Sequence, residues 1–361
     1  MARIDLDHLG HTYDSSGPQA TYALKPFTHT WEDGETYAIL GPSGCGKTTL
    51  LNAISGIIRP SEGRVLFDGT DVTGLPTAQR NIAQVFQFPV IYRTMTVFDN
   101  LAFPLVCRGL PEQVIKARVL EVAELLNLTS SLHLAALRLS ADAKQLISLG
   151  RGLVRNDVAA ILLDEPLTVI DPQLKFELRR KLKEVNRRYG LTLVYVTHDQ
   201  TEAMTLANKV VVMNRGSVVQ IGTPQELFER PEDAFVGYFI GSPSMNMLEC
   251  RLAGDGVAIG DLSIALPGLD QAAIPAGAKL ALGVRPEYVS ITDQVNPDTV
   301  PATIIDLKSV GAFRIATLQV AGQTVKAKIR ADAPIPADRV QAQFEHGRRV
   351  LYANDRLAAV G

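Results

Sequence analysis

Apolar runs and charged, helix-forming stretches alternate along the first half of the chain. Thr36–Leu40, Ala159–Leu163 and Thr192–Thr197 consist almost entirely of apolar or β-branched residues, and this pattern predicts three buried strands. The charged stretch Pro172–Arg188, between the second and third runs, is predicted to be a helix. Strands that alternate with helices indicate a largely parallel sheet flanked by helices. We therefore expect an α/β domain in this part of the chain.

One long stretch interrupts this alternation. Leu110–Arg155 is rich in Leu, Ala, Glu and Lys and is predicted to be mainly helical. We expect it to form most of a helical subdomain, spanning about residues 90–157, that lies on one side of the sheet.

The pattern changes again in the last third of the chain. Short segments of alternating apolar and polar residues, such as Lys279–Val284, are separated there by Gly, Pro and Asp. This pattern is typical of an all-β domain, either one small barrel or a pair of barrels. We place the domain boundary between Tyr238 and Ser244, which divides the chain into residues 1–240 and 241–361.

Composition narrows the class of protein. Its 361 residues are enough for two or three folding units. The apolar fraction of 46% is ordinary for a globular protein with a substantial core. The 36 basic and 38 acidic side chains nearly cancel, so the overall charge does not favour binding to nucleic acid. Cys45, Cys107 and Cys250 lack metal-ligand spacing, which favours a reduced, cytosolic protein. No secretory signal or bilayer-spanning run is visible, so we expect membrane association only through partner proteins.

A phosphate-binding loop is the strongest chemical signal in the sequence. The segment from Gly41 to Thr49 matches G-x-x-x-x-G-K-[ST] and lies between a predicted strand and a predicted helix, the context that this motif requires. Its glycines let backbone N–H groups turn toward phosphates, and the start of the helix attracts an anion. A chance glycine-rich turn is the alternative. We expect ATP to bind on Gly41, Pro42, Ser43, Gly44, Cys45, Gly46, Lys47, Thr48 and Thr49.

The chemistry of phosphoryl transfer suggests roles for individual side chains. Lys47 is expected to reach the β- and γ-phosphates, and the Thr48 hydroxyl is expected to ligate Mg²⁺. Asp164 and Glu165 follow an apolar strand. Asp164 is placed to hold Mg²⁺, and Glu165 is a candidate general base for the attacking water. Acidic residues also end strands simply because solvent is near, but two of them downstream of a phosphate loop favour catalysis.

Two further polar residues follow predicted strands. His198 comes directly after Thr192–Thr197, at the end of a strand where open α/β sheets bind ligands, and we expect it to contact the γ-phosphate. Gln87 follows another short apolar run and is expected to orient water or to ligate Mg²⁺. A structural histidine and an amide in a turn are the alternatives for these two residues.

The order of these motifs resembles that of the ATP-binding cassette (ABC) family. The matching positions are Lys47, Gln87, Leu139–Ser140, Asp164–Glu165, Asp171 and His198. The resemblance implies a head-to-tail dimer, in which each ATP lies between the phosphate loop of one chain and the signature segment of the other, where Ser140 contributes a hydroxyl. It also implies that Tyr13 stacks on adenine, although Tyr13 fits equally well as an ordinary strand aromatic.

Nearly the whole chain is similar to the ATPases of carbohydrate-uptake importers of the maltose and glycerol-phosphate type. The similarity is carried by Val196–Met204, Gln220–Pro224, Phe239–Asn246 and Gly283–Glu287. It implies a P-loop ABC ATPase domain followed by an OB-like C-terminal barrel, and a function in which hydrolysis of Mg-ATP energises uptake of a sugar, polyol or related solute. The implied partners are permease membrane subunits, a second ATPase subunit and, indirectly, a solute-binding protein outside the membrane. The implied location is peripheral, at the cytoplasmic face of the cell membrane.

The signature segment departs from the family. Its usual form is Leu-Ser-Gly-Gly-Gln, whereas this chain has Leu139-Ser-Ala-Asp-Ala143. Side chains at Ala141 and Asp142 restrict the backbone, and a carboxylate repels phosphate unless it turns outward or caps the next helix. Before Asp171 the chain has Thr-Val-Ile in place of Ser-Asn-Leu or Ser-Ala-Leu. The signature resembles that of glycerol and polyol importers in which two different ATPase chains pair, so a homodimer and a non-identical pair both remain open.

The segment Phe88–Val97 is unusually apolar for a loop. The resemblance implies that it forms part of a groove for a short permease helix, and an internal packing loop is the alternative. Two other functions compete with transport. An ABC ATPase of DNA repair or translation usually carries a coiled-coil insertion or a second cassette, and neither is seen here. A regulatory module with little turnover is favoured by the altered signature, but Glu165 and His198 argue against it.

Overall fold

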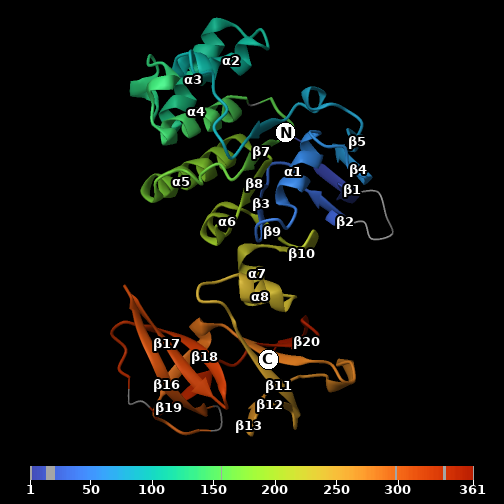
Figure 1. Ribbon diagram of the computed structural model, residues 1–361, viewed down its shortest axis with the longest axis vertical. Helices are drawn as coiled ribbons and strands as arrows, with labels where there is room; N and C mark the ends of the chain where they lie inside the picture. The colour runs from blue at the N-terminus through green and yellow to red at the C-terminus, as the bar shows by residue number, and fades with distance from the viewer. Residues whose placement is uncertain (1, 14–20, 156, 297–298, 336–338, 361) are drawn as a thin grey trace. The chain divides into compact units, whose positions relative to one another are not determined.

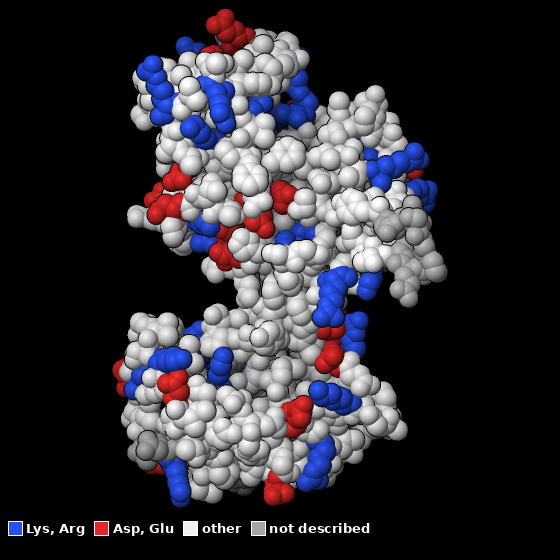
Figure 2. All heavy atoms as spheres, in the orientation of Figure 1, with Lys and Arg blue, Asp and Glu red and all other residues white. Residues whose placement is uncertain are grey.

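The computed structural model describes residues 2–13, 21–155, 157–296, 299–335 and 339–360 (Figure 1). The chain forms two compact units, one ending at Pro224 and the other beginning at Gln225. Acidic and basic side chains are interspersed over both units on the face shown in Figure 2, in line with the nearly balanced composition. No helix in the described part of the chain has the length and apolar character that are needed to cross a membrane.

The N-terminal unit is built on a six-stranded sheet with the order β10-β9-β3-β8-β7-β6. Neighbouring strands are parallel except for the β9–β10 pair. The strands are β3 (Thr36–Leu40), β6 (Ala83–Val85), β7 (Ile161–Asp164), β8 (Leu193–Thr197), β9 (Lys209–Asn214) and β10 (Ser217–Gly222). The three strands predicted from apolar runs are therefore confirmed. Because they are parallel, the loops after β3, β6, β7 and β8 meet at one edge of the sheet, where ligands bind in such folds.

A second, antiparallel sheet covers one face of the first. Its order is β2-β1-β4-β5, with β1 (Ile4–Thr12), β2 (Tyr22–Trp31), β4 (Glu62–Phe67) and β5 (Thr70–Asp71). Helix α1 (Lys47–Ser55) lies between the two sheets and buries Leu50, Leu51 and Ile54 in the shared core. A short 3-10 turn, η1 (Thr77–Gln79), precedes β6. This packing holds the start of α1 at the ligand-binding edge of the main sheet.

Helices cover the other face, and three of them form the predicted insertion between β6 and β7 (Figure 1). These are α2 (Val97–Val106), α3 (Glu112–Leu125) and α4 (Ala141–Leu153), with 3-10 turns η2 (Thr129–Ser131) and η3 (Ala136–Arg138). Helix α5 (Pro172–Tyr189) agrees with the predicted charged helix, and α6 (Gln200–Leu206) follows β8. The apolar sides of these helices share a core with alternate residues of β6, β7 and β8.

The C-terminal unit is mainly β, as predicted. One sheet has the order β13-β12-β11-β14-β20-β21 and the other β15-β19-β16-β17-β18. The strands are β11 (Asn246–Ala253), β12 (Gly256–Ile259), β13 (Leu262–Ala265), β14 (Leu280–Val284), β15 (Val289–Thr292), β16 (Thr299–Val310), β17 (Phe313–Val320), β18 (Gln323–Arg330), β19 (Arg339–Phe344), β20 (Arg349–Ala353) and β21 (Arg356–Val360). The 3-10 turns are η4 (Gln271–Ala273) and η5 (Pro286–Tyr288). Apolar residues of both sheets share a core.

Two short helices, α7 (Pro224–Glu229) and α8 (Ala234–Phe239), belong to the C-terminal unit. The fully buried guanidinium of Arg285 explains why, since it donates to the carbonyls of Phe228 at 3.0 Å and Gly237 at 3.0 Å and also bonds to that of Ile240. The contacts thus divide the chain after Pro224, the first residue of α7, whereas the sequence pattern predicts a division between Tyr238 and Ser244.

Candidate nucleotide-binding site

The phosphate loop connects β3 to α1. Gly44 and Gly46 have φ values of 77° and 103°, which side chains other than that of glycine rarely adopt. Gly46 is the N-cap of α1, and no side chain caps the helix. The N–H groups of the first turn are therefore available to an anionic ligand, and the helix dipole favours negative charge there.

Two glycines allow the loop to pass close to other backbone segments. A Cβ on Gly41 would lie 2.3 Å from the carbonyl oxygen of Met213, and a Cβ on Gly46 would lie 2.3 Å from that of Ala23. Both distances are far below van der Waals contact, so these positions require glycine for space, and Gly46 requires it for its φ value as well.

The ammonium of Lys47 lies over the loop. The residue is buried, and its Nζ donates hydrogen bonds to the carbonyl oxygens of Gly41 at 2.8 Å and Pro42 at 3.0 Å. These neutral acceptors hold the positive charge in place without neutralising it. An arriving phosphate therefore finds a fixed cation beside the start of α1.

Asp164 ends β7 and is almost fully buried. Burial raises its pKa, a hydrogen bond with Thr48 lowers it, the nearby Glu165 raises it again and Lys47 lowers it. The hydroxyl of Thr48, the carboxylate of Asp164 and the amide oxygen of Gln87 are hard oxygen ligands of the kind that Mg²⁺ prefers. The residues present therefore fit a magnesium ion held partly by the protein and partly by phosphate oxygens.

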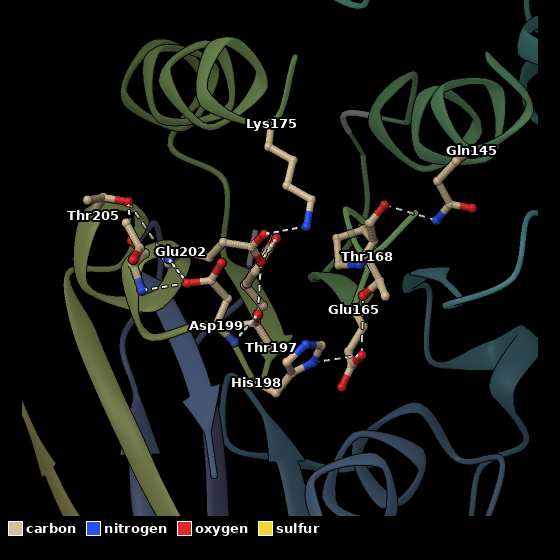
Figure 3. Close-up of polar contacts among 12 residues, drawn as sticks. Gln145, Glu165, Thr168, Lys175, Thr197, His198, Asp199, Glu202 and Thr205 are labelled. Carbon is tan, nitrogen blue, oxygen red and sulfur yellow. Dashed lines mark hydrogen bonds and ion pairs between the residues drawn. The ribbon is translucent and has the colours of Figure 1, made fainter. Parts of the chain in front are cut away.

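Three side chains converge on one oxygen of Glu165. Its Oε2 lies 3.1 Å from Nδ1 of His198, accepts from Oγ1 of Thr168 at 3.2 Å and accepts from Nε2 of Gln87 at 3.4 Å. Figure 3 shows the His198 ring directed at this carboxylate from the end of β8. Glu165 also has a φ of 46°, an uncommon value for a residue other than glycine. The structure thus brings together three predicted residues and one, Thr168, that the sequence reasoning did not assign to the site.

These groups line a cavity of about 570 Å³ at the edge of the sheet. Its wall consists of Tyr13, Ala23, Ser43, Gly44, Gly46, Lys47, Thr48, Thr49, Gln87, Glu165, Thr168 and His198. Ala23 and Thr168 are the two members that were not predicted. Cys45 does not line the cavity, because its side chain is buried in the core, where burial raises the pKa of the thiol. Gly41 and Pro42 contribute through the carbonyls that hold Lys47.

Tyr13 lies at the rim of this cavity. Its side chain is 67% exposed, its hydroxyl is 3.2 Å from Oγ1 of Thr49, and its ring packs edge-on against His11. Strand β1 ends one residue earlier, at Thr12. An exposed ring that is tethered at the phosphate loop fits an aromatic that stacks on a nucleobase.

The signature segment lies outside this cavity. Ser140 is the N-cap of α4, and its hydroxyl accepts a hydrogen bond from the backbone N–H of Ala143. Ala141 and Asp142 form the regular first turn of α4 and have no positive φ, so their side chains impose no backbone strain. Asp142 does not cap α4, because Ser140 does, so the predicted capping role of this aspartate is wrong. Its carboxylate lies in the first turn, where it complements the helix dipole. It nevertheless places a negative charge at a helix start that would otherwise attract an anion.

Comparisons with known proteins agree with this geometry. Residues 24–168 match the family model described as ABC transporter, and residues 241–289 match that of the MalK OB fold domain. The chain is 40% identical over 317 residues to the sn-glycerol-3-phosphate import ATP-binding protein UgpC of Escherichia coli O157:H7, covering 88% of this chain and 87% of that protein. It is 40% identical over 330 residues to the trehalose/maltose import ATP-binding protein MalK of Thermococcus litoralis, covering 87% and 88%.

Two solved structures share the fold. One is cbiO1 from Clostridium perfringens, part of the transporter complex cbiONQ, with a TM-score of 0.57, 30% identity, and coverage of 63% of this chain and 90% of that chain. The other is a dimeric, post-hydrolysis state of the ATP-binding cassette MJ0796 bound to ADP and Pi, with a TM-score of 0.55, 27% identity, and coverage of 61% and 98%. The predicted combination of a P-loop ATPase fold and an OB-like barrel is confirmed.

Proposed function

The chain belongs to the family of ABC import ATP-binding proteins, and we propose that it hydrolyses ATP in the cavity described above to drive uptake of a sugar, a polyol or a related solute through separate membrane subunits. The observation that carries this proposal is the common cavity of Lys47, Glu165 and His198. A phosphate-binding cation, a carboxylate and an imidazole on one cavity wall are the groups that hydrolysis of a phosphoanhydride requires.

Each residue has a distinct task in this reaction. The N–H groups of the loop and the ammonium of Lys47 bind the phosphates and offset their negative charge. Glu165 accepts the proton of the attacking water on its carboxylate, whose Oε2 is held by His198, Thr168 and Gln87. Thr48, Asp164 and Gln87 would hold Mg²⁺, which supplies additional stabilisation of phosphate charge when it is bound.

The partners follow from the family. We propose a head-to-tail dimer in which Ser140 of a second ATPase chain completes each site, together with permease subunits and, indirectly, a solute-binding protein. The second chain is either another copy or a non-identical relative. Closure of the dimer on ATP moves the permease toward its outward-facing state. Through the permease, the chain lies at the cytoplasmic face of the membrane.

The segment Phe88–Val97 is the proposed contact with the permease. Phe88 and Val90 are 75% and 52% exposed, which is unusual for large apolar side chains. Tyr92, in the same segment, packs against the guanidinium of Arg151, which lies 4.6 Å from its ring centroid, and against Phe103. An apolar helix fits such a surface. Tyr92→Glu and Met95→Glu should uncouple transport from ATP hydrolysis but leave ATP binding unchanged, and loss of ATP binding would contradict this contact.

The decisive experiment is co-purification of the chain with its native membrane partners, followed by assays of ATP binding and hydrolysis. Lys47→Ala should weaken ATP binding at least roughly tenfold, because charge-assisted hydrogen bonds contribute about 1.5–3 kcal/mol. Lys116→Ala, an exposed lysine on α3, is the matched control and should change nothing. Absence of ATP binding by the unmodified complex would overturn the proposal.

A further inference from the structure

A buried carboxylate belongs to α6, the helix that follows His198 in the chain. Glu202, on α6, is only 3% exposed, and its Oε2 accepts hydrogen bonds from the hydroxyls of Tyr195 at 2.7 Å and Thr197 at 2.8 Å. Both donors belong to β8, the strand that ends immediately before His198. Figure 3 shows Glu202 and Thr197 on the side of His198 away from Glu165. A buried carboxylate with two hydroxyl donors is a rigid anchor rather than a solvated surface acid.

This anchor controls the backbone on both sides of His198. Oγ1 of Thr197 accepts a hydrogen bond at 3.0 Å from the backbone N–H of Asp199 while its own proton goes to Glu202. The carboxylate of Asp199 in turn accepts from the N–H groups of Thr201 and Glu202 at the start of α6. His198 therefore sits between two residues whose positions depend on Glu202. Its own side chain is 56% exposed, so packing does little to place the ring.

The second oxygen of Glu202 connects the anchor to another part of the site. Its Oε1 lies 3.6 Å from Nζ of Lys175, in the first turns of α5. The backbone N–H of Lys175 bonds to the carbonyl of Asp171, the residue that precedes α5. Asp171 in turn closes the segment that begins at Thr168, whose hydroxyl donates to Glu165. The ion pair thus joins α5, which follows the loop after β7, to α6, which follows β8.

We propose that Glu202 is a positioning residue for ATP hydrolysis. Through Thr197 it holds His198 in contact with Glu165, and through Lys175 it fixes the position of the segment Thr168–Asp171 relative to His198. Glu202 itself does not touch the nucleotide. The inference rests on the proposed function, because it concerns the same reaction.

Two variants that remove chemically similar bonds test the first link. Thr197→Val and Tyr195→Phe each delete one hydroxyl that donates to Oε2 of Glu202, but only Thr197 also holds the backbone of Asp199. In the complex with the membrane partners, Thr197→Val should lower kcat at least about tenfold, because small displacements of a catalytic group are costly, with KM for ATP within about twofold. Tyr195→Phe should leave kcat within about twofold although its Tm also falls. Equal losses of kcat in the two variants would overturn the proposal.

A double-mutant cycle distinguishes positioning from general loss of stability. In a His198→Ala background, Thr197→Val should change the residual kcat by less than about twofold, because the residue that it positions is already gone. The decrease in Tm should persist in that background, since the hydrogen bond is lost in either case. If the kcat of the double variant fell by the product of the two single-variant factors, Thr197 and Glu202 would not act through His198. This result too would overturn the proposal.

The link to α5 is tested by its charge. Lys175→Met keeps the aliphatic stem and should lower kcat several-fold, and Lys175→Arg should restore it, because a cation is again available to Oε1 of Glu202. If arginine failed to restore kcat while the unmodified complex was active, the proposed role of the Lys175–Glu202 ion pair would be wrong. An unmodified complex that bound and hydrolysed no ATP would instead count against the proposed function, so the two failures are distinguishable.

Discussion

Nδ1 of His198 lies 3.1 Å from Oε2 of Glu165, although the two residues follow different strands. The register of the sheet explains this proximity, because β7 and β8 are parallel neighbours in which Asp164 pairs with Val196. Glu165 lies one residue beyond Asp164 and His198 two residues beyond Val196, so both side chains emerge at the same edge of the sheet. Their contact is a consequence of strand order and not of local sequence.

Glu165→Gln should lower kcat by roughly 10²-fold or more while ATP binding is retained, because an amide cannot accept the proton of the attacking water. Single-turnover hydrolysis and equilibrium ATP binding would separate the two effects. Glu184→Gln, the same change on the exposed side of α5, should behave like the unmodified protein. Full turnover by Glu165→Gln would exclude Glu165 as the base.

The two positive-φ glycines of the phosphate loop should respond differently to alanine. In Gly46→Ala the new Cβ would meet the Ala23 carbonyl oxygen at 2.3 Å, whereas at Gly44 no atom lies within 4 Å. Gly44→Ala should cost only the strain of its φ, about 1–2 kcal/mol, and Gly46→Ala should cost more and also prevent nucleotide binding. Thermal unfolding with and without ATP would measure both. Equal stability of the two variants would contradict the close approach seen here.

Asp164 should make the nucleotide-free protein less stable at neutral pH. Because its folded-state pKa is raised above the ordinary 3.8, mainly by burial, the unfolded chain releases this proton first as the pH increases. The folded state then holds more protons, so the free energy of unfolding decreases as the pH rises from 3.8 through the raised value. Asp164→Asn should therefore raise Tm at neutral pH, with a gain that shrinks toward acid pH. A variant no more stable than the unmodified protein at neutral pH would refute this sign.

Asp142 should affect activity and stability in opposite directions. Its carboxylate favours the start of α4, but in the proposed dimer it would repel a phosphate bound to the partner chain, by about 1 kcal/mol or more. Asp142→Gly should therefore raise the ATPase rate of the complex by roughly fivefold and lower Tm slightly. Glu112→Gln, which removes an acid from the first turn of α3, is the control. An unchanged ATPase rate would mean that the carboxylate points away from the partner's nucleotide.

Arg285 should be important for the stability of the C-terminal unit, because it is fully buried. Burial lowers its pKa to about 10, yet its guanidinium serves the carbonyls of Phe228 and Gly237 and lies 4.3 Å from the Phe228 ring centroid. Arg285→Met leaves these buried carbonyls without donors and should cost about 2–4 kcal/mol in the free energy of unfolding of this unit. Arg251→Met replaces an exposed arginine on β11 and should change the free energy of unfolding little. Calorimetric unfolding of both variants would measure the difference.

Local pattern sufficed where one feature dominates a short stretch. The apolar runs that became β3, β7 and β8 are buried throughout, so their hydrophobicity is directly visible in the sequence. The phosphate loop was equally predictable, because its glycines and Lys47 are neighbours in the chain. For the same reason the charged helix α5 was assigned within a residue of its observed end.

Relations between distant residues were not predictable in this way. The hydroxyl of Thr168 and the pairing of Lys175 with Glu202 depend on how the loops after β7 and β8 are brought together. The domain boundary also depends on contacts between residues distant in sequence, because Arg285 bonds to the carbonyls of Phe228 and Gly237. The prolines and glycines after Tyr238 suggested a boundary there because only the local sequence was visible.

Because α7 and α8 belong to the C-terminal unit, they determine where the ATPase domain and the barrel can be separated or exchanged between related proteins. Val236 and Ile240, which belong to the C-terminal unit, are fully buried, and the hydroxyl of Tyr352 donates to the carbonyl of Pro231. An ATPase fragment cut after residue 240 would carry two orphaned helices and expose their apolar sides. Chimaeras joined near Pro224 keep each hydrophobic interior whole, and a protease should release the barrel most cleanly at the same place.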